Sequence, residues 1–245
     1  MRAFIIALQF LTCIPLAPGM KVNEEEVGRS MRYFPLVGLC MGACLALVHI
    51  PLAALLPLSV ADGMIIALLA ALSGAIHLDG LADTTDGIAG GKDREERLRI
   101  MKDPRVGAIG VVCVVLVIML KYVALLAVPL HLKFRAILLI PLIGRWAQVL
   151  VAYRAEYAGL TRGVGFTFTR QVTLTVVLAT SLLVGAFAYY LFSLKGAVIA
   201  VATLAACRVY AAYFRRTLGG VTGDVLGAAT ELAETAALVM LLVKF

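Results

Sequence analysis

The stretch VGAIGVVCVVLVIMLKYVALLAVPL (Val106–Leu130) holds 25 residues and a single charge, that of Lys121. A helix needs about 20 consecutive, mostly apolar residues to cross the hydrocarbon core of a bilayer. This run is also much longer than a buried strand, so its length and composition predict a transmembrane helix. We therefore expect an integral membrane protein whose fold is built from such helices.

Further apolar runs repeat this pattern along the chain, at about 34–57, 60–79, 135–152, 171–192, 196–214 and 224–243, besides a first segment near the N-terminus. The 245 residues are 62% apolar and only 15% charged, with a mean hydropathy of +0.99. Soluble domains are about 45–50% apolar and about 25% charged. We expect one all-α domain over residues 1–245, a polytopic membrane helix bundle of seven or eight spans. That count leaves no room for a separate soluble domain.

Basic residues gather in the segments 18–32, 90–105, 153–170 and 215–223, which together hold 14 of the 22 Lys and Arg residues. The opposite side is expected to hold only five, namely Arg2, Lys133, Arg135, Lys195 and Lys244. By the positive-inside rule the basic side should face the cytoplasm. This rule accounts for the net charge of +7 without a nucleic-acid partner, so the expected surroundings are the lipid bilayer.

Six of the fifteen acidic residues lie outside predicted loops, whereas the other nine, Asp62 among them, lie in such loops. Asp79, Asp83 and Asp86 come from AIHLDGLADTTDG (Ala75–Gly87), at the end of an apolar run. On a helix their spacing places the three carboxylates within about 60° of one another. Such a group repels itself, and the C-terminal end of a helix disfavours anions, so we predict a bound divalent cation.

Oxygen ligands without a cysteine cluster favour Mg²⁺, with Mn²⁺ as a substitute, over zinc. His77 lies beside these carboxylates. It could be a further ligand, a base or a hydrogen-bond partner of a ligand.

Asp224, Glu231 and Glu234 form a second acidic group in GGVTGDVLGAATELAE (Gly219–Glu234). A buried carboxylate needs a partner, because leaving it unpaired costs several kcal/mol or forces protonation. Either metal ions or the arginines inside predicted spans could be that partner. The basic residues inside predicted spans are Lys121, Arg145 and Arg208.

Glycines and basic residues near both acidic groups are suited to phosphate binding, because free amides at a helix N-terminus and cationic side chains attract anions. We expect Asp79, Asp83 and Asp86 to bind metal and, with His77, to carry the chemistry. The predicted substrate-binding residues are Lys102, Arg105, Arg215, Arg216, Gly220, Thr222, Gly223, Glu231 and Glu234. Metal-binding carboxylates and cations at one membrane face are typical of phosphoryl transfer.

The chain resembles the cobalamin synthase family, in motifs that follow one another along nearly its whole length. The motifs are FLTCIP (Phe10–Pro15), YFPLVG (Tyr33–Gly38), HLDGLADTTDG (His77–Gly87), MKDPRVGAIG (Met101–Gly110) and LGGVTGDVLGA (Leu218–Ala228).

The resemblance implies a multi-pass enzyme of the bacterial inner membrane with a cytoplasmic active site. It would complete the nucleotide loop of adenosylcobalamin in vitamin B12 biosynthesis, with Mg²⁺ as cofactor. Its expected substrates are adenosylcobinamide-GDP and α-ribazole or its 5′-phosphate, and GMP would leave. The resemblance also implies that Asp224 joins Asp79, Asp83 and Asp86 as a metal ligand and catalytic residue. One carboxylate or His77 would be the base.

Two other functions are compatible with parts of the pattern. A membrane phosphotransferase of the CDP-alcohol type also sets Asp-Gly and further aspartates on membrane helices. It usually has Ala-Arg two residues after Asp-Gly, whereas in this chain Leu81-Ala82 is followed by Asp83. A cation- or proton-coupled transporter should show a repeated half, and the HLDG motif has no second copy. The sequence leaves the oligomeric state open, a homo-oligomer included.

Overall fold

The computed structural model describes residues 1–17, 19–159 and 163–244, and this part of the chain is helical throughout apart from turns and one isolated bridge between Tyr157 and Val221. The elements are α1 (Arg2–Leu11), α2 (Glu24–Ser30), the 3₁₀ turn η1 (Met31–Tyr33), α3 (Phe34–Leu55), α4 (Leu58–Leu72), α5 (Ile76–Gly90), α6 (Arg94–Ile100), α7 (Ala108–Ala127), α8 (Leu130–Ala152), α9 (Val164–Gln171), α10 (Leu174–Leu218) and α11 (Gly223–Leu242). The prediction of an all-α fold is confirmed for the described residues.

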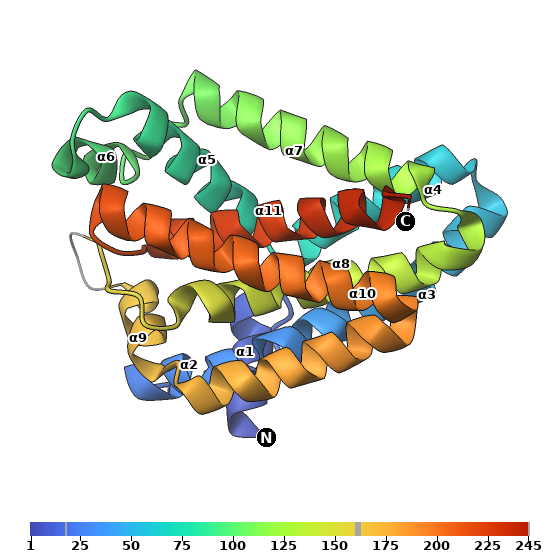
Figure 1. Cartoon of the computed structure of the whole chain (residues 1–245), viewed down its shortest axis with the longest axis horizontal. Coiled ribbons are helices and arrows are strands. Elements are labelled where there is room, and N and C mark those ends of the chain that lie inside the picture. The colour runs from blue at the N-terminus through green and yellow to red at the C-terminus, as the bar shows by residue number, and fades with distance from the viewer. Residues whose placement is uncertain (18, 160–162, 245) are drawn as a thin grey trace.

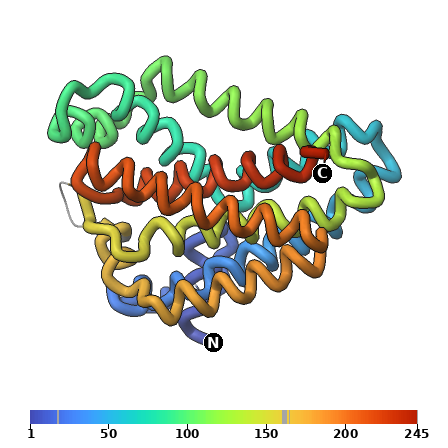
Figure 2. Tube along the Cα trace, viewed as in Figure 1, coloured from blue at the N-terminus to red at the C-terminus, as the bar shows by residue number. Residues whose placement is uncertain are grey.

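The helix α8 forms the centre of the bundle. In its most apolar 18-residue window 89% of the residues are buried, against 28% for α7 and for α10, which lie on the outside. It packs against α3, α10 and α11 (Figures 1 and 2). Close packing with α3 depends on Gly38 and Gly42, because a Cβ on either would meet α8 backbone at 2.3 and 2.7 Å.

The 45-residue helix α10 is interrupted where Phe192 and Ser193 leave helical geometry, Ser193 with φ 51°. Figure 1 shows the two halves running side by side in opposite directions. A straight helix of this length would span about 68 Å, far more than the roughly 30 Å hydrocarbon core, so the reversal returns the chain into the bundle.

Five helices are long and apolar enough to cross a membrane, or six if α4 and α5 count together as one bent span. These helices suggest a multi-pass membrane protein. The number is lower than the seven or eight expected. One reason is that the ten-residue α1 is too short to span. Another is that α10 counts as one helix here, although its two halves, which hold the runs 171–192 and 196–214, run in opposite directions.

The basic segments lie together, since α2, α6, α9 and the turn between α10 and α11 are at the same end of the bundle (Figure 1). Arg162 lies outside the described residues. The placement of Arg2 on the opposite side is wrong: its guanidinium donates to Lys21 O at 2.7 Å and pairs with Glu26 at 2.7 Å, next to α2. We call this the basic end of the bundle.

The prediction that Asp62 lies in a loop is also wrong, because α4 buries it completely. Its carboxylate meets His49 of α3 at 2.9 Å and the Lys133 ammonium of α8 at 2.5 Å. Lys133 also donates to Leu125 O at the end of α7. This buried ion cluster therefore ties four helices together at the end opposite α6 and α9.

Candidate active site

The stretch that holds the first three aspartates is a separate helix, α5, which bends away from α4 by 84°. Gly74 (φ 62°) and Ala75 (φ 56°) are left-handed, and Ala75 N donates to Ala70 O at 2.8 Å, the pattern of a glycine-terminated helix end. Asp79 therefore lies in the first turn of α5. The expectation that these carboxylates lie near a C-terminal helix end is wrong for Asp79, which the positive end of the α5 dipole favours. Asp86, in contrast, lies four residues before α5 ends.

The second acidic motif begins α11 directly beside α5. The Thr222 side chain caps this helix by accepting from Val225 N, and Asp224 follows in the first turn. The two helices cross at Gly80, where a Cβ would come within 2.7 Å of Asp224 O. Because only glycine permits this approach, residue 80 determines how closely Asp224 lies to the carboxylates of α5.

A cavity of about 240 Å³ opens at this crossing, at the basic end of the bundle. Five of the predicted residues line it: His77, Asp79, Lys102, Gly223 and Asp224. Their lining neighbours, not predicted from the sequence, include Gln148 and Tyr157. Two motifs more than 140 residues apart in the chain thus face one enclosed space.

Lys102 connects the loop after α6 to this cavity. Its ammonium donates to Asp224 Oδ2 at 3.0 Å. Burial alone would lower the pKa of Lys102, but the hydrogen bond and the charge of Asp224 outweigh it and raise the pKa above its ordinary value. The cavity therefore holds one fixed positive charge among carboxylates.

Asp83 lies one turn after Asp79, close enough to Asp79, Asp86 and Asp224 for their charges to repel its own. Asp86 has a different environment. Its two oxygens accept from Gly107 N and Gly110 N, both at 2.7 Å, at the start of α7. To bind a cation as predicted, Asp86 would have to use its remaining lone pairs.

Among the described residues, no three His, Cys, Asp or Glu side chains are close enough together to hold a metal ion. The donors themselves suit a hard cation, because Asp79 and Asp224 line the cavity with carboxylate oxygens and Asp83 lies one turn further along α5. A change of rotamer or of helix position would be needed to bring three of these oxygens onto one ion.

The other predicted phosphate-binding residues lie near the cavity but do not line it in this structure. Arg105 is exposed and folds back onto Asp103 at 2.8 Å. Arg215 and Arg216 are exposed in the last turn of α10. Gly220 is buried, and a Cβ there would meet Glu156 O at 2.2 Å.

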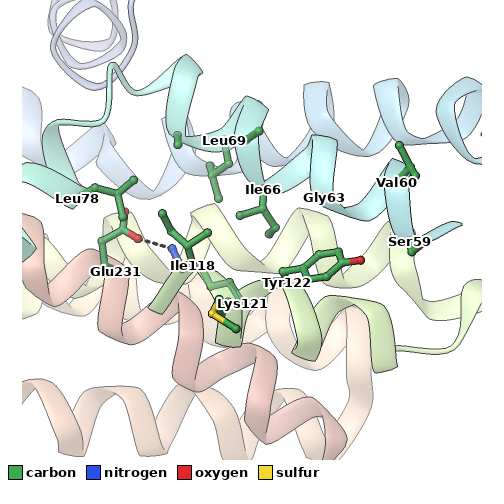
Figure 3. Close-up of a pocket in the computed structure, with 13 residues that line it drawn as sticks. Ser59, Val60, Gly63, Ile66, Leu69, Leu78, Ile118, Lys121, Tyr122 and Glu231 are labelled. Atoms are coloured by element: carbon green, nitrogen blue, oxygen red, sulfur yellow. Dashed lines mark hydrogen bonds and ion pairs between the residues drawn. The ribbon is translucent and has the colours of Figure 1, made fainter. Parts of the chain in front are cut away.

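Glu231 and Glu234 lie deeper in the bundle, in a second buried ion cluster. The Lys121 ammonium of α7 contacts both carboxylates at 2.6 Å, and Arg145 of α8 pairs with Glu234. Figure 3 shows Glu231 and Lys121 meeting below Leu78. The expectation of an arginine partner is confirmed for Arg145, whereas the pairing with Lys121 was not predicted. The predicted role of Glu231 and Glu234 in substrate binding stays a prediction.

The chain is a helical membrane protein, because its helices are long and apolar enough to span a bilayer. At one end these helices enclose a site that holds carboxylates and one lysine. The chain belongs to the cobalamin-5-phosphate synthase family: the family model described as "CobS: Cobalamin-5-phosphate synthase" matches residues 3–242.

Curated relatives agree with this assignment over their whole length. A protein of Geotalea daltonii named adenosylcobinamide-GDP ribazoletransferase is 41% identical over 242 residues, covering 98% of this chain and 97% of the relative. Proteins with the same name from Syntrophobacter fumaroxidans and Pseudomonas fluorescens are each 40% identical, covering 94% and 96% of this chain and the same shares of the relatives. No solved structure matches the chain significantly.

Proposed function

We propose that this protein is an adenosylcobinamide-GDP ribazoletransferase of the bacterial inner membrane. It joins adenosylcobinamide-GDP to α-ribazole, or to α-ribazole 5′-phosphate, and gives adenosylcobalamin, or its 5′-phosphate, and GMP. The observation that carries the proposal is the cavity in which Asp79, Asp224 and Lys102 meet, in a chain that matches the named relatives from end to end.

The reaction is a phosphoryl transfer between two oxygens. The ribazole hydroxyl attacks the phosphorus on the corrinoid side, a new P–O bond forms, and the P–O bond to GMP breaks. Lys102 binds a diphosphate oxygen and balances the charge that develops on it. The base that accepts the hydroxyl proton is either Asp79, which lines the cavity, or Asp83, one turn further along α5.

Mg²⁺ fits this site as the cofactor, with Asp79, Asp83 and Asp224 as the residues that would hold it. When bound, the ion would neutralise negative charge on the diphosphate and on the leaving GMP. Asp86 has a different role in this proposal: it fixes the start of α7, and thereby the Lys102 loop, against α5 through its two amide contacts.

The size of the cavity limits what it encloses. Sites for drug-sized ligands measure about 300–1,000 Å³. At about 240 Å³ this cavity has room for the reacting diphosphate and its nearest atoms. The bulky corrin ring therefore stays outside, at the basic end, which faces the cytoplasm by the positive-inside rule.

The test is purified protein in liposomes with adenosylcobinamide-GDP, α-ribazole and Mg²⁺. GMP and adenosylcobalamin should form in equal amounts, and α-ribazole 5′-phosphate in a parallel reaction shows which acceptor is preferred. Absence of GMP from well-folded protein would exclude the function. Transfer from a CDP-linked alcohol in its place would favour a CDP-alcohol-type phosphotransferase.

A further inference from the structure

A long apolar groove follows α10 and α11 on the outside of the bundle. Two adjoining cavities form it, of about 700 and 310 Å³, and Ala206, Tyr210 and Leu232 line both. All side chains that line these cavities, among the residues that the structure describes, are uncharged. None of them lines the catalytic cavity, so the groove is separate from that site.

The groove is long enough for the acyl chain of a lipid. Along α10 its lining runs from Ala202 to Phe214, a distance of about 18 Å at 1.5 Å per residue. Half of the roughly 30 Å hydrocarbon core, the thickness of one leaflet, is about 15 Å. The groove also opens to the surroundings of the bundle, because Val209 in its wall is 72% exposed and Leu232 is 41% exposed. In a membrane these surroundings are lipid.

The groove ends beneath two arginines. Phe214, which lines it, is in the last turns of α10. Arg94, at the start of α6, lies against the end of that helix, since a Cβ on Gly219 would be 3.1 Å from its guanidinium carbon (α6 and α10 in Figure 1). Arg216 follows Val209 by seven residues, so the period of the helix places it on the same face of α10, above the open edge of the groove.

The protein itself does not neutralise these two arginines. Arg94 and Arg216 are exposed, and neither forms an ion pair in the part of the chain that the structure describes. Tyr213 in the groove wall is 48% exposed, and tyrosines gather at the level where lipid headgroups begin. Two unpaired cations close to that level, at the basic end of the bundle, attract anionic headgroups.

We propose that the groove is a binding site for an anionic phospholipid of the cytoplasmic leaflet. One acyl chain lies along Ala206 and Leu232, and Arg94 and Arg216 hold the phosphate. Basic pockets between membrane helices on the cytoplasmic side bind anionic lipids in this way. In this proposal the phosphate that Arg216 binds belongs to a lipid and not to the nucleotide substrate. The inference does not rest on the proposed function.

A second copy of the chain fits the groove less well than a lipid does. Small residues spaced four apart, such as Ala202 and Ala206, also allow membrane helices to pack closely. A second copy inserted in the same orientation would, however, bring its own Arg94 and Arg216 to the same level, and like charges that face each other oppose association. A lipid phosphate neutralises these charges instead.

The groove lies behind the helix that carries the carboxylates of the site. Its lining residues Leu81 and Ile88 are turned by about 140–180° from Asp79 and Asp83 around α5. An acyl chain in the groove therefore packs against the back of α5 while the carboxylates face the other way. Bound lipid should raise the melting temperature of the protein, because a ligand that binds only the folded state stabilises it.

Native mass spectrometry of the solubilised full chain measures the binding directly. Phosphatidylglycerol should bind at least about fivefold more tightly than phosphatidylcholine with the same chains, and should raise the melting temperature more. Glycerol 3-phosphate, which has the charge but no chains, should not displace it. Equal affinities for the two lipids, equal melting temperatures, or displacement by glycerol 3-phosphate would overturn the inference.

Two pairs of variants locate the site on α10. Arg216→Gln should weaken the binding of phosphatidylglycerol about fivefold, whereas Arg215→Gln, on the face of the helix opposite Ala206, should change it less than about twofold. Ala206→Phe places a ring in the space of the acyl chain and should weaken binding about fivefold or more. Ala205→Phe is the control, because this neighbour is exposed but does not line the groove.

Equal affinities within either pair, for variants with the circular dichroism spectrum of the wild type, would contradict the site. A wild-type dimer that binds no phosphatidylglycerol and that Ala206→Phe dissociates would assign the groove to a second copy. These measurements need no substrate, so their outcome is independent of GMP release.

Discussion

The buried cluster of Lys121, Glu231, Glu234 and Arg145 allows a quantitative test of the packing around the site. It contains two carboxylates and two cations, so its charges balance. At 2.6 Å and an effective dielectric constant near 20, each Lys121 contact is worth about 6 kcal/mol of attraction, offset by several kcal/mol of desolvation per ion. In Lys121→Met, Glu234 keeps Arg145 but Glu231 loses its cation.

An uncompensated buried charge costs about 3–5 kcal/mol, so Lys121→Met should lower the free energy of unfolding by that amount. The double variant Lys121→Met with Glu231→Gln restores charge balance, because only Glu234 and Arg145 then remain. It should recover at least about 2 kcal/mol, since a buried ion pair can often be replaced at little cost. The assay is equilibrium unfolding in mixed micelles with increasing dodecyl sulfate, followed by circular dichroism.

Two outcomes would refute this reasoning. One is a loss near the roughly 0.6 kcal/mol that a neutral hydrogen bond between membrane helices contributes on average. The other is a double variant no more stable than Lys121→Met, since charge balance would then have no part in the effect.

Three further substitutions test the site and its support. Gly80→Ala puts a Cβ within 2.7 Å of α11 backbone and should displace Asp224 from α5. A shift near 1 Å should lower kcat/KM about 100-fold. Gly185→Ala is the control and should leave kcat/KM unchanged, because a Cβ there has no atom within 4 Å. Lys102→Met removes a charged donor worth about 2 kcal/mol and should lower kcat/KM about 30-fold. Lys92→Met, at an exposed position, should leave kcat/KM unchanged. Equal kcat/KM values for the two variants would contradict the role of Lys102. Asp62→Asn leaves the charge of Lys133 unpaired and should reduce the free energy of unfolding by about 3–5 kcal/mol. The folded fraction should keep the wild-type kcat. A loss of kcat without a loss of stability would mean that this distant cluster acts on the site.

Much of the site could be predicted from the sequence because its chemistry is local. Carboxylates spaced four and seven residues apart share a helix face whatever surrounds that helix. A glycine-rich turn before Asp224 likewise indicates a helix start. The cavity brings Asp79, His77 and Asp224 of these two motifs together with Lys102, which comes from the motif Met101–Gly110.

What the sequence could not predict depends on distant contacts. Ala61-Asp62-Gly63 has the composition of a loop, and it is buried because Lys133, 71 residues later, neutralises it. No role was predicted for Gln148, a polar residue in the apolar run 135–152. An amide in such a run is itself a signal of a buried hydrogen bond. The bend at Ser73 and Gly74 disappears when hydropathy is averaged over the run 60–79, so one span was predicted where two helices meet at 84°.

The central claim is that transfer takes place at the carboxylates where α5 and α11 cross. The most direct test compares the initial rate of GMP release from adenosylcobinamide-GDP and α-ribazole for Asp83→Asn and Asp93→Asn. Asp93 is exposed at the same end and caps α6 through Glu96 N, a role that asparagine also fills.

Both variants exchange one carboxylate for an amide, and both should fold as the wild type by circular dichroism. We predict that Asp83→Asn loses at least about 100-fold in rate at saturating Mg²⁺, because a charge that stabilises the transition state is gone. Asp93→Asn should keep the wild-type rate. Equal rates for the two variants would contradict the account.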